Sequence, residues 1–272
     1  MPSLCVWRKK TSISKLYMEM RKTVLYGVIA LCLVVLSSCL GDPATQLTMA
    51  NQTGVVATNV GSVGKVIFVK GGDVISSENF QNANVEDGEC ILFDYSIDYG
   101  LAENADGGAN KGYMTATIYE NTLSEVSQWQ LFNTLTDTSN VENGELLLST
   151  LQPRSSYIKG NLFLFTEMSG HKTAQEDSFA LSYNPDQVLN GDQVYSLYLR
   201  AIKTAEGGEE DNGQSMIIPC AFNIQDFVKK VTGENNTDEV KFRVNYASAF
   251  GKDSASIVWK SSDVFTINPS GK

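Results

Sequence analysis

Histidine is nearly missing from this sequence of 272 residues, because His171 is the only one. Catalytic triads, histidine-rich metal sites and phosphoryl transfer through histidine all need an imidazole held among partners. His171 lies in a polar, turn-like stretch, beside Lys172 and near Glu176 and Asp177. The sequence therefore predicts a solvated loop residue at this position and nearly excludes chemistry that depends on histidine.

Positive charge is also scarce, and it is unevenly placed. The chain has 21 Lys and Arg against 31 Asp and Glu, which gives a formal net charge of −10. Residues 1–38 hold six of the bases and one of the acids, so the rest of the chain carries 15 bases and 30 acids. A chain this acidic has no electrostatic attraction for nucleic-acid phosphates or an anionic bilayer surface. We therefore expect no nucleic-acid partner.

Common catalytic motifs are absent too. The sequence contains no Gly-x-Ser-x-Gly elbow, phosphate-binding Walker loop or dinucleotide fingerprint. Glycoside hydrolysis needs two acids held close together, but the acids gather in turn-like segments, with Asp94 and Asp98 as exceptions. The expectation is a protein without enzymatic activity, cofactor or bound metal.

A short apolar run near the N-terminus has the features of an export signal. Arg21 and Lys22 precede the 13 apolar residues 24–36, and small residues follow at once. A membrane helix needs about 20 apolar residues, so this run is too short for a comfortable span. Because a complete signal begins at Met20, we expect the natural start there.

Leu36-Ser37-Ser38-Cys39 resembles the lipobox of bacterial lipoproteins. The resemblance implies cleavage before Cys39, acylation of its thiol and anchoring in a membrane by several acyl chains, such as palmitate. The alternative is an uncleaved signal anchor with an incidental cysteine. The apolar run stops at the cysteine and polar sequence follows, which favours the lipobox.

Cysteine use agrees with export. Of the five cysteines, two leave with the signal and Cys39 carries the lipid, so only Cys90 and Cys220 remain. Both lie in apolar, strand-like runs, and we expect two buried free thiols. Their separation in the sequence does not exclude a disulfide.

The rest of the chain has a β pattern. Short runs of β-branched and aromatic residues alternate with Gly, Asn and Asp clusters, which is typical of sandwiches and barrels. The clearest strand is Lys241–Tyr246, which alternates with a period of two. The other expected strands are Gly64–Lys70, Glu89–Ile97, Tyr113–Tyr119, Asn161–Thr166, Val194–Ile202, Gln214–Phe222, Ala255–Lys260 and Val264–Ile267.

Two stretches favour a helix. Apolar residues recur at i, i+3, i+4 and i+7 from Ile224 to Val231, with Asn223 as N-cap and Gly233 as a stop. The second stretch, residues 123–135, has scattered apolar residues but no clear cap.

Turn-rich sequence between about residues 137 and 154 predicts a domain boundary. We expect a signal region at 1–38, a tether at 39–51, a first β domain at 52–140 and a second at 141–272. The second domain is long enough for a sandwich of seven or eight strands with its own core.

The lipobox, the segment VEDGECILFDYSI at residues 85–97, and a second β domain closing with Lys241–Ala249 and Ser254–Ile267 resemble the NigD-like lipoproteins of Gram-negative anaerobes. The resemblance implies an all-β chain with a small OB-like barrel followed by an immunoglobulin-like β-sandwich. It also implies a link to bacteriocin immunity, but it supplies no functional residues. Such anaerobes O-glycosylate exported proteins at Asp-Ser/Thr-apolar sequons, so Asp253-Ser254-Ala255 makes Ser254 a candidate for O-glycosylation.

Acidic and aromatic groups are the remaining candidates for binding. The clusters at residues 103–106 and 206–211 are typical of solvated loops, with calcium binding as the alternative. The open face of an OB-like barrel can take oligosaccharides, and aromatic rings could stack on sugars, although strand aromatics are usually half-buried framework. The aromatic candidates are Tyr95, Tyr99, Tyr113, Tyr119 and Trp129.

Together these features predict a non-catalytic lipoprotein of the outer membrane, held to the membrane through Cys39. We expect it to be a binding module for an unknown protein or glycan ligand. The alternative is an adhesin, similar to fimbrillins, or a glycan-binding accessory lipoprotein of the surface. Residues 40–42 lack the dense acids that mark many surface-exported lipoproteins, which favours the periplasmic side.

Overall fold

The computed structural model describes residues 45–269, except for residues 62, 136–137, 190, 209–214 and 236. The expected start at Met20, the apolar run at residues 24–36 and the lipidated Cys39 lie outside the described residues. Within the described part of the chain, no helix is long and apolar enough to cross a membrane.

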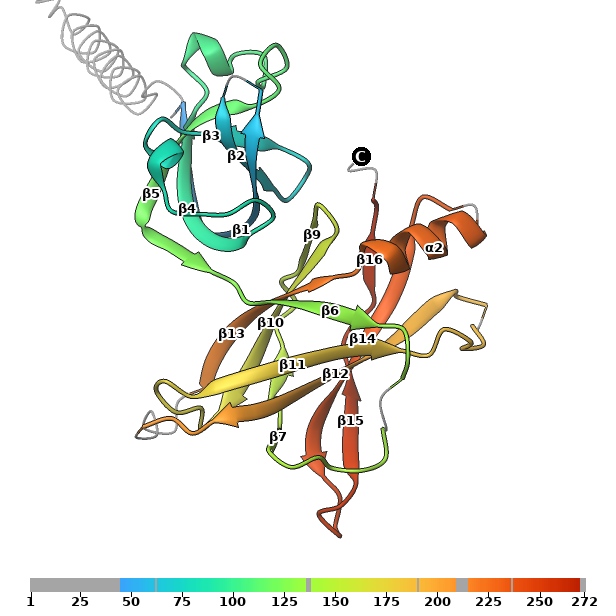
Figure 1. Cartoon of the computed structure of the whole chain (residues 1–272). Coiled ribbons are helices and arrows are strands. Elements are labelled where there is room, and N and C mark those ends of the chain that lie inside the picture. Colours follow the sequence, from blue (N-terminus) through green and yellow to red (C-terminus); the bar gives the residue numbers. More distant parts are fainter. Residues whose placement is uncertain are drawn as a thin grey trace, which may run out of the picture. The chain divides into compact units, whose positions relative to one another are not determined.

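Five strands close into a small barrel (Figure 1). They are β1 (Gln46–Val60), β2 (Gly64–Val69), β3 (Val74–Ser76), β4 (Cys90–Asp98) and β5 (Met114–Glu125). Their order is β1-β2-β3-β5-β4, and only β3 and β5 run parallel. Two 3₁₀-helices, η1 (Asn79–Asn82) and η2 (Ala102–Asn104), lie in the connections. The expected OB-like barrel is confirmed.

Alternation along the strands explains the barrel core. Successive side chains of a strand point to opposite faces, so Ile91, Phe93, Tyr95 and Ile97 of β4 all enter the core. β1 pairs with β2 along one edge and with β4 along the other, and the register shifts once on each side. Such irregularities bend a strand, as the closure of a barrel requires. Glycine is needed at position 54, since a Cβ there would run into core side chains of β2 and β4.

Eleven further strands within the described residues form one sheet, which begins at residue 128, before the expected domain boundary, and is called the second domain below. They are β6 (Gln128–Phe132), β7 (Glu145–Leu146), β8 (Thr150–Leu151), β9 (Ser156–Ile158), β10 (Asn161–Ser169), β11 (Glu176–Tyr183), β12 (Val194–Ala205), β13 (Ser215–Asn223), β14 (Val240–Phe250), β15 (Ile257–Ser261) and β16 (Phe265–Ile267). The main order is β15-β14-β12-β11-β6-β13-β10-β8, with β7, β9 and β16 paired at the sides. β6 runs parallel to both β11 and β13, so it joins the two halves of one curled sheet.

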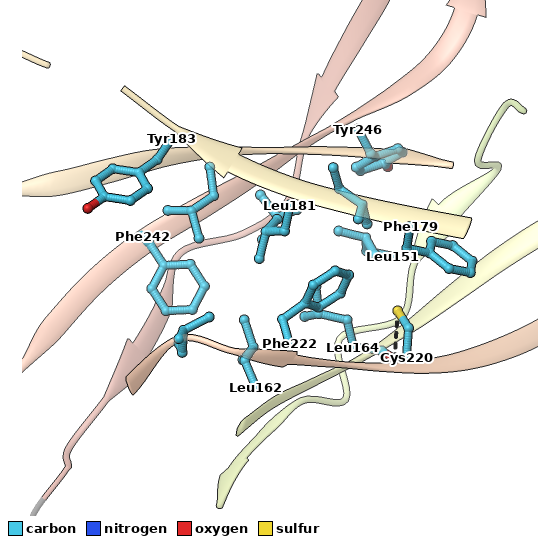
Figure 2. Packing of buried hydrophobic residues seen from close by; sticks show 14 of the residues in the cluster. Leu151, Leu162, Leu164, Phe179, Leu181, Tyr183, Cys220, Phe222, Phe242 and Tyr246 are labelled. Carbon is cyan, nitrogen blue, oxygen red and sulfur yellow. Dashed lines mark hydrogen bonds between the residues drawn. The ribbon is translucent and has the colours of Figure 1, made fainter. Parts of the chain in front are cut away.

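The two halves of this sheet enclose a common apolar core (Figure 2). Leu162 and Phe222 come from the half containing β10 and β13, and Leu181 and Phe242 come from the half containing β11 and β14. All four side chains are at most 1% exposed. The all-β class is therefore confirmed, and the sandwich is made by one curled sheet that β6 connects.

One of the two expected helices is confirmed and the other is wrong. Helix α2 (Gln225–Asn235) begins where expected, and Oδ1 of Asn223 accepts a hydrogen bond from the backbone N–H of Gln225 at 3.2 Å. It continues past Gly233 rather than stopping there. Residues 123–135 instead form the end of β5 and all of β6. Gln128-Trp129-Gln130-Leu131 alternates with a period of two, as in a strand. The strand pairs with β13 at residues 128–130 and with β11 at residues 131–132.

A buried ion pair fixes β7 to the sheet. Arg200 of β12 is 2% exposed, and its Nε donates to both carboxylate oxygens of Glu145 at 3.1 Å. Its Nη2 also donates to the carbonyl of Asn140 at 3.0 Å, and Nη1 lies 2.9 Å from Oε1 of the exposed Glu142. One guanidinium therefore holds the segment from residue 140 to β7.

Candidate binding site

The prediction that His171 is a solvated loop residue is wrong. Its side chain is 9% exposed, and Nε2 lies 2.8 Å from Oδ2 of Asp177, whose side chain is 4% exposed. Nε2 of Gln175 donates to the other carboxylate oxygen of Asp177 at 2.8 Å. His171 and Gln175 lie in the turn between β10 and β11, and Asp177 is the second residue of β11, so the turn brings the three side chains together. The imidazole therefore stabilises a turn rather than facing a substrate.

The described acidic clusters lie in exposed loops. Glu103 forms an ion pair with Lys111 at 2.9 Å, and this hydrogen-bonded partner lowers the pKa of the carboxyl. The backbone N–H of Asn110 lowers the pKa of Asp106 in the same way. Glu206 pairs with Lys203 at 2.6 Å, while residues 209–211 of the second cluster lie outside the described residues. Within the part that the structure describes, no group of three His, Cys, Asp or Glu is arranged to hold a metal ion.

The aromatic candidates are divided between framework and surface. Tyr95 is 5% exposed in the barrel core, and Trp129 packs against the core of the curled sheet. Tyr99 and Tyr119 are 46% and 36% exposed on the barrel, and Tyr113 is partly exposed. None of the five lines the hollows described below.

The two remaining cysteines are free and buried, as expected. Burial, with a smaller contribution from Glu89, raises the pKa of the Cys90 thiol to about 12. Burial alone raises the pKa of the Cys220 thiol. Because the thiolate is the nucleophile, neither cysteine is prepared for catalysis.

The glycosylation candidate Ser254 is exposed in the turn between β14 and β15. Asp253 accepts hydrogen bonds from the backbone N–H groups of Ala255 and Ser256, and these lower the pKa of its carboxyl. Modification of Ser254 stays a prediction.

Part of the outer barrel surface is covered by the second domain. Val55 of β1 pairs with Phe68 of β2 and Cys90 of β4, so the three side chains form one outward row. The row packs into one apolar cluster with Ile158, Phe163 and Ala221 of the second domain. Thr53 and Ser156 add a buried hydrogen bond of 2.6 Å between their hydroxyls. Gln46–Lys272 accordingly forms one compact unit, and this row is closed to a ligand.

Four amide side chains gather on the outward face of β6 and its neighbours, and the sequence analysis missed them. Asn161, Asn223 and Gln130 are paired across β10, β13 and β6, and paired residues point to the same face. Gln128 shares this face of β6, and its Nε2 donates to Oδ1 of Asn161 at 2.8 Å. We call these four residues the amide patch. The alternation Gln128-Trp129-Gln130-Leu131 was the signal that could have revealed half of it.

Two hollows open beside the amide patch. The first has a volume of about 820 Å³ and is lined by Gln128, Asn161 and Asn223, together with β1 and the loop before β4. The second has a volume of about 430 Å³ and is lined by Gln130 and Asn223, together with the end of β11 and the start of α2. Asn223 lines both hollows. Both volumes fall in the range of roughly 300–1,000 Å³ that small-molecule sites occupy.

The first hollow carries an excess of negative charge. Glu86, Asp87 and Glu89 come from the loop before β4, and Glu125 comes from the end of β5. Lys159 is the one cation among its lining residues. Like charges repel, so this arrangement disfavours anionic ligands.

Tyr183 presents a hydroxyl group at the second hollow. Tyr183 lines it and is 5% exposed, and its ring packs edge-on against Phe227 with centroids 4.9 Å apart. Figure 2 shows the hydroxyl pointing away from the core cluster. The hydroxyl is not among the buried polar atoms left without a partner, so it reaches solvent in the second hollow. It is therefore held rigidly and is free to bind a ligand.

Comparison with known proteins identifies the first domain. Residues 44–122 match the family described as the lipoprotein OB domain. A search of curated protein sequences finds no match. The class that fold and comparison together define is thus an all-β protein with a small closed barrel, whose residues 44–122 match the lipoprotein OB domain family.

Several solved structures share the fold. An uncharacterized protein from Parabacteroides merdae is 23% identical, with a TM-score of 0.69 over 82% of this chain and 98% of that one. A candidate lipoprotein from Bacteroides fragilis is 12% identical, with a TM-score of 0.52 over 82% and 97%. A NigD-like immunity protein from Bacteroides caccae is 11% identical, with a TM-score of 0.47 over 82% and 97%. At these identities the likeness to the Parabacteroides merdae and Bacteroides fragilis proteins concerns the fold alone.

Proposed function

We propose that this chain is a non-catalytic lipoprotein of the cell envelope, anchored through Cys39, that acts as a binding module. The match of residues 44–122 to a lipoprotein OB family carries the proposal, because Leu36-Ser37-Ser38-Cys39 lies directly before the matched segment. In this account the acyl chains on Cys39 hold the unit that begins at Gln46 close to the membrane.

The chemistry of the described side chains supports binding rather than catalysis. The imidazole of His171 is buried against Asp177, and both thiols are buried with raised pKa values. By contrast, the amide patch and its two hollows offer many hydrogen-bonding groups on a rigid sheet. Recognition sites are built from such concave surfaces with convergent polar groups.

Replacement of the anchoring cysteine tests the proposal. In the native host, Cys39→Ala should move the protein from the membrane fraction to the soluble fraction, since the acyl chains supply the membrane affinity. Cys32→Ala is the matched control, because it removes another leader thiol and should leave the protein in the membrane. Retention of the Cys39→Ala chain in the membrane would contradict the lipid anchor.

We further propose the outer membrane, with the domains on its periplasmic side. Protease added to intact cells should then leave the chain whole, and the same protease should cleave it after lysis. Protection would support an immunity-type or envelope partner. Cleavage in intact cells would instead support a surface adhesin or a glycan-capturing lipoprotein.

A further inference from the structure

We propose that the second hollow and the adjoining amide patch bind an uncharged carbohydrate. This inference rests on the proposed function, because it names the ligand class of that binding module. Four observations carry it: the paired amides, the rigidly held hydroxyl of Tyr183, the negative charge of the neighbouring hollow and the pairing of β6 with both β11 and β13.

The amides match the hydrogen-bonding pattern of a polyhydroxy ligand. A side-chain amide has two N–H donors and a carbonyl acceptor, and a sugar hydroxyl both donates and accepts. Gln130 and Asn223 are paired on neighbouring strands, which lie about 4.8 Å apart. One ligand can therefore contact both amides, with Gln225 at the start of α2 as a third amide in the same hollow.

Tyr183 supplies an observation that is independent of the amides. Tyr183 is 5% exposed as a whole, and its hydroxyl is not among the buried polar atoms left without a partner, so this end of the side chain reaches solvent. The ring is locked against Phe227, and the hydroxyl leaves the core cluster on the side away from it (Figure 2). A ligand hydroxyl in the second hollow can take the place of solvent as hydrogen-bond partner of the Tyr183 hydroxyl.

Charge excludes acidic ligands from the neighbourhood. Glu86, Asp87, Glu89 and Glu125 line the first hollow, which shares Asn223 with the second. In the second hollow, Asp226 and Lys230 contribute one charge of each sign. A phosphorylated, sulfated or sialylated ligand that extends along the amide patch would meet the carboxylates of the first hollow. A neutral glycan meets no such repulsion, and its hydroxyls can donate to the carboxylates.

The pairing of β6 disfavours a peptide at the same place. An extended peptide commonly binds by adding a strand to an open sheet edge. β13 pairs with residues 128–130 of β6 and β11 pairs with Leu131 and Phe132, so each residue of this short strand already has a neighbouring strand on one side. Most side chains that line the second hollow are polar, which suits a ligand that is polar on all sides.

Binding of the full chain to defined oligosaccharides tests the inference. The probes are an array of neutral oligosaccharides (maltoheptaose, cellohexaose, mannohexaose and chitohexaose) with a heparin hexasaccharide and a sialylated trisaccharide as anionic counterparts. The variants are Tyr183→Phe, which removes only the hydroxyl, and Gln130→Ala, which truncates an exposed amide. Tyr246→Phe is the matched control, since it removes a hydroxyl from a tyrosine of the same core that lines neither hollow.

We expect binding of at least one neutral oligosaccharide and of neither anionic one. Tyr183→Phe and Gln130→Ala should each weaken this binding by about fivefold to tenfold, as expected for one lost hydrogen bond, and Tyr246→Phe should leave it unchanged. Far-ultraviolet circular dichroism and the melting temperature show whether each variant keeps the fold.

Three results would overturn the inference. Folded variants that bind sugar as tightly as the natural chain place the carbohydrate elsewhere, while the binding module itself stands. Absence of binding to every neutral oligosaccharide, or a preference for the anionic ones, rejects the ligand class. The proposed function fails separately, if Cys39→Ala does not release the chain from the membrane.

Discussion

The buried Arg200–Glu145 pair should be one of the most sensitive points of the second domain. Arg200→Met removes the guanidinium but keeps much of the apolar volume. It leaves the side chain of Glu145, which is fully buried, without its cation, and it removes a bond to the carbonyl of Asn140. Removing one partner of a buried ion pair costs about 3–5 kcal/mol because the other charge stays buried and unpaired. We expect the free energy of unfolding to fall by that amount.

Urea unfolding followed by tryptophan fluorescence measures this loss. Nε1 of Trp259 donates to the carbonyl of Thr138 at 2.8 Å, so this fluorophore reports on the segment that the pair holds. Arg200→Met combined with Glu145→Leu removes both charges and should recover most of the stability. Glu142→Gln is the control, because its side chain is 56% exposed and should change stability little. A single variant as stable as the natural chain, or a double variant no better than the single one, would refute the reasoning.

Three further predictions depend on burial. In a chain whose three cysteines before residue 45 are replaced by serine, Cys90 and Cys220 should resist iodoacetamide at pH 8 and react only on unfolding. The reason is that the fold raises the pKa values of both groups and keeps them as thiols. Rapid alkylation of the folded chain would contradict this prediction. The same shifts predict that stability falls as pH rises from the ordinary thiol pKa of about 8.5 toward 12, since unfolding then releases protons. Phe163→Ala should lower the free energy of unfolding by about 3–5 kcal/mol, because Phe163 is 0% exposed in the cluster that joins barrel and sheet. Phe132→Ala is its control, at 51% exposure, and equal losses for the two variants in urea unfolding would count against the cluster.

The fold class could be predicted from the sequence because it depends on local alternation. Strands such as Lys241–Tyr246 bury every second side chain, and the barrel strand Cys90–Asp98 lies within the segment that carried the family resemblance. Helix α2 was predictable for the same reason, since its spacing and its Asn223 cap are local.

Features that depend on pairing between distant segments could not be predicted. His171 lies in a polar stretch, which predicts an exposed side chain. The turn that buries it against Asp177 depends on tertiary packing, and composition does not show that packing. β6 was expected to be part of a helix, and its true state depends on β11 and β13, which lie far along the chain.

The amide patch could not be predicted either, because it too depends on pairing between distant segments. Asn161, Asn223 and Gln130 are scattered in the sequence, and only the register of three strands places them in one row. The position of the Tyr183 hydroxyl at the second hollow is likewise visible only once the core around Phe227 is in place.

The mass of the protein extracted from native membranes tests the lipid anchor directly. We expect a chain that begins at Cys39 and carries the added mass of acyl groups, with those groups confined to its N-terminal peptide. A chain that retains residues before Cys39, or one that begins there with an unmodified thiol, would contradict a lipid-anchored envelope protein.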